Sequence, residues 1–180
     1  MITFLRFVGV TNAAIWFGAT FFFSFVAGTA FFSPEMVHYI PAPYNGLAAE
    51  IVIGRLFVLH HTCGIIALLH LTAEWLYAGR LLHRATLALL IGLFALNLYG
   101  GLVLQPRLKH LHLVRYAPQS KPADREAATQ SFRAWHRASM LGNLLVMGGL
   151  LLYLWQVVNA APPASAPFIG GPKFGIDKRP

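Results

Sequence analysis

One long apolar block carries four side chains that could do chemistry: His60, Cys63, His70 and Glu74. On a helix that turns 100° per residue, these four positions fall within an arc of roughly 80°. Ionisable groups at membrane depth are costly and normally face a bundle interior, a cavity or a cofactor. The stripe is therefore a candidate site, whereas His61 points about 100° away, toward the side that carries Glu50.

A second polar stripe runs along the last apolar block, where His136, Ser139, Asn143 and Met147 recur at spacings of three and four, with Met140 beside them. These spacings place the residues on one helix face. Polar residues of the two other blocks are expected to complete a shared interior by hydrogen bonding between helices: Asn12, Trp16, Thr20 and Asn97.

Three chemistries fit two such stripes. Neutral imidazoles on different helices can ligate haem iron axially, which makes His60 or His70 with His136 the candidate haem b ligands, with Ser139, Asn143 and Glu74 in the same site. Imidazole, thiol and thioether groups instead suit copper, through His60, Cys63, His136, Met140 and Met147. In the third interpretation the histidines only hydrogen-bond between helices or form a proton path.

Catalytic motifs of other kinds are missing from the sequence. It has no glycine-rich phosphate loop after a strand, no CxxCH haem attachment site and no HExxH zinc motif. None of its serines stands in a local nucleophile motif. We therefore assign no catalytic residue and expect a protein without catalytic activity of its own.

The composition places these stripes in a membrane. Of 180 residues, 57% are hydrophobic and 11% are charged, whereas a soluble domain has roughly 25% charged residues. The apolar residues form four long blocks, which excludes a soluble enzyme and indicates four spans. The formal net charge of +8 comes from bases clustered between the blocks, which is typical of topogenic and lipid-contacting charge, so nucleic acid is not an expected partner. Cys63 is the single cysteine, so no disulfide can form within the chain.

The predicted architecture is all-α: an integral membrane four-helix bundle over residues 1–159, with spans at about 7–32, 48–77, 85–104 and 136–158. The short 79–84 turn makes the second and third helices antiparallel neighbours, and residues 33–45 read as an irregular loop. A polar stretch follows Pro106, with a helical piece from about Asp124 that continues into the fourth span. Residues 160–180 are rich in proline and glycine and predict an extended tail.

The charges between the spans favour one orientation. The third loop, 105–135, and the start of the fourth span carry seven bases, so the positive-inside rule places this side in the cytoplasm, in a bacterial inner membrane. These bases are Arg107, Lys109, Arg115, Lys121, Arg125, Arg133 and Arg137.

Several strings resemble a known membrane family. AIWFGATFFFSFVAGTAFFSP, then EIVIGRLF, a third helix that leaves through Asn97 and Pro106, and FRAWHRASMLGNLL are similar to the family of domain of unknown function 4149, which includes transmembrane-protein-205-like proteins. The resemblance covers about residues 8 to 155 and implies a four-helix bundle without assigning an activity. Matching positions are Trp16, Gly18, Pro34, Phe57, Pro106, His136, Ser139 and Asn143. RLFVLHH, with Arg55 and His60, resembles a string of the haem-binding membrane protoporphyrinogen oxidases, which favours haem.

These observations lead us to expect a small subunit of a larger respiratory or photosynthetic membrane complex, with a structural or assembly role. Its partners would be lipids and other subunits, which contact the helix faces and the docking tail 160–180. The alternative is a self-sufficient haem b or metal protein that acts in electron transfer or as an oxidoreductase. A transport or resistance protein is a third possibility, although four helices with short loops offer little alternating-access machinery.

Overall fold

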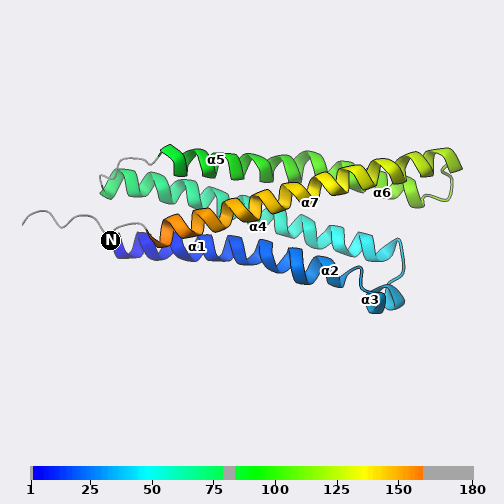
Figure 1. Ribbon diagram of the computed structural model, residues 1–180, viewed down its shortest axis with the longest axis horizontal. Coiled ribbons are helices and arrows are strands. Elements are labelled where there is room, and N and C mark those ends of the chain that lie inside the picture. Colours follow the sequence, from blue (N-terminus) through cyan, green and yellow to red (C-terminus); the bar gives the residue numbers. More distant parts are fainter. Residues whose placement is uncertain (1, 79–83, 160–180) are drawn as a thin grey trace, which may run out of the picture.

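The computed structural model describes residues 2–78 and 84–159, all of which belong to helices or to the short segments that join them. Figure 1 shows one elongated helical bundle. In chain order its elements are α1 Ile2–Phe22, the π-helical turn η1 Phe23–Ala27, α2 Gly28–Ala30, α3 Pro34–Tyr39, α4 Tyr44–Ala78, α5 Arg84–Tyr99, the π-helical turn η2 Gly100–Leu104, α6 Gln105–Tyr116 and α7 Pro122–Val158.

Four continuous helical stretches are long and apolar enough to cross a membrane: Thr3–Ala30, Tyr44–Tyr77, Arg84–Tyr116 and Pro122–Val158. The predicted integral membrane four-helix bundle is confirmed. Helix α1 packs against α4 and α7, and α5 packs against the same two helices, which gives a four-sided bundle. Each stretch has 28 to 37 residues, whereas about 20 span the hydrocarbon layer, so the bundle extends beyond it.

The bundle has a narrow core of small and large apolar side chains. Ala13 and Trp16 of α1, Ala67 of α4, and Leu150 of α7 are fully buried. The outward faces carry exposed phenylalanine, leucine, isoleucine and valine side chains. In a membrane this distribution is expected, because lipid tails solvate the outer apolar face.

The segment after the first span is more ordered than the sequence predicted. Residues 33–45 were expected to form an irregular loop, but Pro34–Tyr39 is helix α3, and α4 already begins at Tyr44. The Ser33 hydroxyl oxygen accepts a hydrogen bond from the Met36 backbone N–H at 3.2 Å, and Pro34 occupies the first turn. A serine cap followed by proline is a typical start of a helix, and it explains why this segment is helical.

The third span also continues past its predicted end. We placed its end at residue 104, but η2 leads directly into α6 through Pro106. Proline has no backbone N–H and clashes with the carbonyl four residues earlier in a regular helix. Here the preceding turn is widened, and the Gln105 N–H donates to the Gly100 carbonyl five residues back. Because the proline follows a wide turn, the helix passes it without ending.

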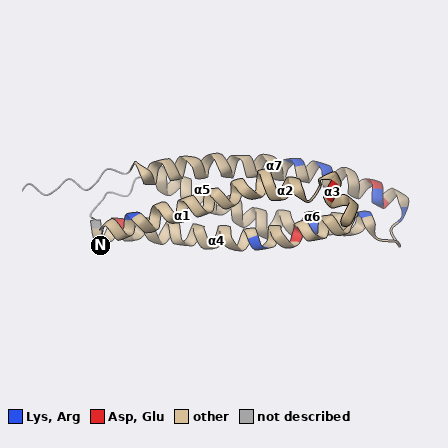
Figure 2. Ribbon diagram, turned by 90° about the horizontal axis from the view of Figure 1, so that it is seen from below, with Lys and Arg blue, Asp and Glu red and all other residues tan. Residues whose placement is uncertain are grey.

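The expected helical piece before the fourth span is confirmed, since α7 runs without a break from Pro122 to Val158. Helices α6 and the first part of α7 pack together as a hairpin that projects beyond α4 (Figure 1). Lysine and arginine residues gather at this end, whereas the middle of the bundle is free of them apart from α4 (Figure 2). The predicted turn at 79–84, apart from Arg84, and the predicted tail 160–180 lie outside the described residues.

Candidate functional site

A layer of polar side chains crosses the bundle and receives at least one residue from each of the four spans. We call it the His60 layer: Thr20 and Ser24 from the first span, His60 from α4, Asn97 from α5 and Asn143 from α7. His60 Nδ1 hydrogen-bonds the Asn97 side-chain oxygen, and His60 Nε2 lies 3.2 Å from Thr20 Oγ1. His60 is only 3% exposed. Both ring nitrogens are therefore engaged by the protein.

Asn143 extends the layer to the fourth helix. Its side-chain N–H donates to Ser24 Oγ at 2.7 Å, and the Ser24 hydroxyl donates to the Thr20 carbonyl at 2.6 Å. Hydrogen bonds between transmembrane helices fix their rotation and depth relative to one another. The layer thus sets the register of all four spans at one level.

The proton positions in this layer follow from its fixed acceptors. The Asn97 amide donates to the Leu93 carbonyl at 2.8 Å, so its oxygen faces His60 and Nδ1 must carry a proton. The Thr20 hydroxyl lies between two acceptors, the Trp16 carbonyl at 2.7 Å and His60 Nε2. With either acceptor, the Thr20 hydroxyl keeps its hydrogen bond inside the layer.

Two π-helical turns flank the layer. The η1 turn contains Ser24, and η2 begins three residues after Asn97. The glycine that opens η2, Gly100, lies against Phe57, where an added Cβ would come within 2.8 Å of the ring. His61 Nε2 lies 3.4 Å from the Asn97 backbone carbonyl. Such wide turns are enriched at functional sites, because they re-aim side chains and backbone groups.

A second polar cluster, the His70 layer, lies nearer the N-terminal end of α1. His70 Nε2 donates to the Leu5 carbonyl at 2.7 Å and lies 4.0 Å from a Glu74 carboxylate oxygen. Gly9 lets the two helices approach, since a Cβ there would meet the His70 ring at 2.5 Å. The hydrogen bond of His70 thus joins α4 to α1, and Glu74 lies one turn from His70 on the same helix.

An apolar section separates the two layers. His60 and His70 are ten residues apart on α4, which corresponds to roughly 15 Å. Between them Cys63 and Ala67 belong to the buried apolar cluster that also contains Leu93 and Val146. Asn12 bridges α1 to α4 in this section, because its amide donates to the Cys63 carbonyl at 2.9 Å. Two buried atoms, Trp16 Nε1 and Tyr153 Oη, have no hydrogen-bond partner among the described residues.

The predicted burial of Asn12, Trp16, Thr20 and Asn97 is confirmed, as is that of His60 and His70. The expectation that His136 turns inward is wrong, because its side chain is exposed and stacks on Phe132, with ring centroids 5.7 Å apart. Further along α7, Val146, Leu150 and Tyr153 are buried.

Only part of the predicted stripe on α7 reaches the interior. Asn143 is half-buried and joins the His60 layer, Ser139 and Met147 are half-buried, and Met140 is exposed. His136 precedes Asn143 by seven residues and so lies roughly 10 Å further along the axis. His136 therefore shares the helix face of Asn143 but lies at a different level from the His60 layer, where that face is exposed.

This arrangement does not assemble the predicted haem ligands. Both ring nitrogens of His60 and Nε2 of His70 are bound to protein partners, and His136 lies outside the interior. The predicted metal set is also divided, with His60 and Cys63 buried but His136 and Met140 exposed. Within residues 2–78 and 84–159, no group of three or more His, Cys, Asp or Glu is placed to hold a metal ion.

Sequence reasoning missed two members of these layers. Ser24 stands four residues after Thr20, on the same helix face. That four-residue spacing is the sequence signal that identifies Ser24 as a member of the layer. The Leu5 carbonyl gives no sequence signal, because any residue presents the same backbone oxygen.

The fold and the site define a class: a four-span helical membrane protein whose interior is tied together by a buried polar layer. The family profile described as domain of unknown function (DUF4149) matches residues 12–117. The chain belongs to this family, and the match includes Thr20, Ser24, His60 and Asn97 of the layer. Comparison with curated proteins and with solved structures found no match.

Proposed function

We propose that the protein is a small structural subunit of a larger electron-transfer complex in a bacterial inner membrane. The observation that carries this proposal is the self-contained His60 layer, in which side chains from four helices satisfy one another. A layer of this kind holds the bundle in one arrangement, which suits a scaffold. The working surfaces of a scaffold are its outer faces, where other subunits dock.

The orientation in this proposal follows from charge. The end of the bundle formed by 33–55 and 105–137 carries eight lysines and arginines against four acidic residues. Under the positive-inside rule this end, with the α6–α7 hairpin, lies in the cytoplasm. The hairpin projects beyond α4 (Figure 1) and thus offers a surface for cytoplasmic partners.

Three exposed glycines allow the outer faces to be tested one by one. At Gly18 of α1, Gly92 of α5 and Gly148 of α7, an added Cβ would meet no other atom within 4 Å. Leucine at each position should therefore leave the bundle intact and obstruct only a molecule seated on that face.

To test this, the full chain is expressed at its natural level and the membranes are extracted with a mild detergent. The size of the protein in this extract on a native gel is then compared with the size of the purified protein. We expect the protein from membranes to migrate as a larger complex. At least one of the variants Gly18→Leu, Gly92→Leu and Gly148→Leu should no longer be found in that complex, although its melting temperature after purification is unchanged. Removing residues 160–180 should also weaken assembly. If the natural-level protein always migrates like the purified one, the proposal is wrong.

A second candidate function is a haem b or metal protein that acts in electron transfer or as an oxidoreductase. The unpartnered Trp16 Nε1 and Tyr153 Oη favour a bound group, because buried polar atoms normally have partners. Its iron or metal ligands would have to be other than the set of His60, His70 and His136, which the bundle does not bring together. A haem or metal absorption band in protein purified from its native membrane, lost in a Trp16→Phe variant, would support this function. Protein with no bound chromophore or metal would leave the scaffold proposal in place.

A further inference from the structure

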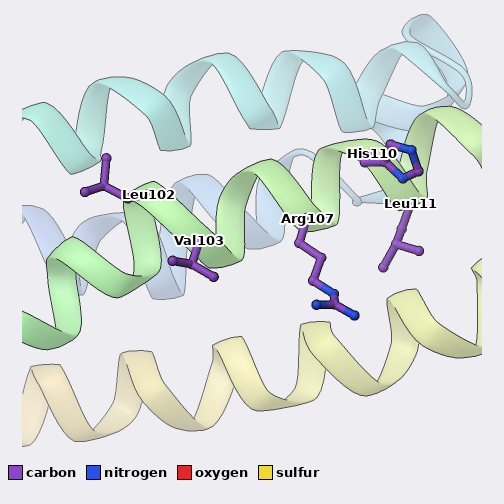
Figure 3. A pocket seen from close by; sticks show the side chains of 5 residues that line it. All are labelled: Leu102, Val103, Arg107, His110 and Leu111. Atoms are coloured by element: carbon purple, nitrogen blue, oxygen red, sulfur yellow. The ribbon is translucent and has the colours of Figure 1, made fainter.

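A groove lies where the third span leaves the apolar part of the bundle. It is open, has a volume of about 590 Å³, and is lined by Leu102 and Val103 of η2 and by Arg107, His110 and Leu111 of α6. Figure 3 shows the Arg107 side chain extending from α6 toward the ribbon of α7, with Val103 and Leu111 on the same side of the helix. One end of the groove is formed by Leu102 and Val103, and the other carries Arg107 and His110 together with Leu111.

The lining changes from apolar to basic at the level where the hydrocarbon layer ends. The apolar run of α5 and η2 ends at Leu104, and Arg107 is the first charged residue after it. On the neighbouring α7 the last charged residue before the apolar run is Arg137. An apolar run of about 20 residues matches the hydrocarbon thickness. Leu102 and Val103 therefore lie at the depth of acyl chains, and Arg107 lies at the depth of headgroups.

Arg107 is held in place without being neutralised. Its guanidinium carbon lies 4.5 Å from the centre of the Trp135 ring. A guanidinium on an aromatic face keeps its N–H edges free for an anion. No Asp or Glu within the described part of the chain pairs with it. By contrast, Lys109 on the same helix is bound to Glu50 at 2.6 Å.

We propose that this groove binds one anionic phospholipid, as a property additional to the scaffold role. An acyl chain lies against Leu102 and Val103, and Arg107 donates two hydrogen bonds to the phosphate. The excess of positive charge at this end of the bundle attracts anionic headgroups. A soluble ligand would match the basic end alone, whereas a phospholipid matches both the charge and the apolar wall.

The test measures lipid binding to the purified full chain in nanodiscs of phosphatidylcholine that contain increasing phosphatidylglycerol, with lipid retention read by native mass spectrometry. Arg107→Gln should weaken retention of phosphatidylglycerol about tenfold, because charge-assisted bidentate hydrogen bonds are lost. Arg137→Gln removes an equal charge from the exposed surface of α7 near the same depth, outside the groove. This control should change retention less than twofold.

A second variant keeps the charge and alters the apolar wall. Leu102 is 69% exposed, so Leu102→Asn should fold and should also weaken phosphatidylglycerol retention. The proposal is overturned if both charge variants weaken retention equally, since the effect would then be general surface attraction. It is also overturned if inorganic phosphate competes as well as the lipid, or if the groove retains phosphatidylcholine equally well.

Discussion

The His60 layer and the His70 layer use the same residue type in different ways. His60 joins α4 to α1 and α5 through both ring nitrogens, and the layer reaches α7 through Ser24 and Asn143. His70 contacts α1 through one nitrogen, which donates to a backbone carbonyl. The first layer therefore specifies how four helices meet, whereas the His70 hydrogen bond fastens α4 to α1.

The two layers also differ in the polar groups that lose a partner when the histidine is removed. Without His60, the Asn97 oxygen loses its partner inside the bundle, and an unpaired buried polar group costs free energy. Without His70, the Leu5 carbonyl is still part of a regular helix and keeps its helical partner. Histidine burial alone, at 3% and 6% exposure, would rank the two residues as equals.

The largest effect should come from His60→Ala. We expect it to lower the free energy of unfolding by about 3 kcal/mol, through a cavity and unpaired polar groups, and His70→Ala to lower it by about half as much. Unfolding of the purified protein in increasing sodium dodecyl sulfate measures both values. An equal or larger loss for His70→Ala would remove the distinction between the layers.

The sequence predicted most of the fold. Long apolar blocks bounded by charges define spans by hydrophobicity alone, and the four spans are confirmed. The predictions that were wrong concern the ends of helices. Ser33 caps the unpredicted helix α3, and a wide turn lets the third span continue past Pro106. Both depend on local backbone geometry, which hydropathy does not report.

The site was predictable only within single helices. The helical periodicity of α4 correctly predicted that His60 and His70 face inward, because the cost of exposing ionisable groups to lipid determines how the helix is rotated about its axis. On α7, Asn143 reached the interior, whereas His136, two turns away on the same face, lies at a level where that face is exposed. Which residues of different helices share a level depends on helix offsets, and the sequence pattern carries no information on these.

An intermediate effect is expected at Gly9, which tests the His70 layer from the opposite helix. Gly9→Ala places a methyl group 2.5 Å from the His70 ring, so the ring or the helix must move. We expect a loss of about 1–2 kcal/mol in the free energy of unfolding, as for other overpacked cores. In a His70→Ala background the same substitution should cost almost nothing, which a double-mutant cycle measures.

Gly18→Ala is the matched control for this cycle. It lies on the same helix, and an added Cβ would meet nothing within 4 Å. Because alanine favours helix over glycine, its expected effect is neutral or slightly stabilising. A loss at Gly18 as large as that at Gly9 would show that backbone propensity, not the contact with His70, causes the effect.

The smallest effect is expected at the outer end of the His60 layer. Asn143→Ala removes the hydrogen bond to Ser24, but the Ser24 hydroxyl still donates to the Thr20 carbonyl. Interhelical hydrogen bonds in membrane proteins contribute about 0.6 kcal/mol on average, so we expect a loss of that size in the free energy of unfolding. A double-mutant cycle with Ser24→Ala should give a coupling of similar size. If Asn143→Ala instead costs as much as His60→Ala, the layer is a single cooperative unit, and its contribution cannot be assigned to the histidine at its centre.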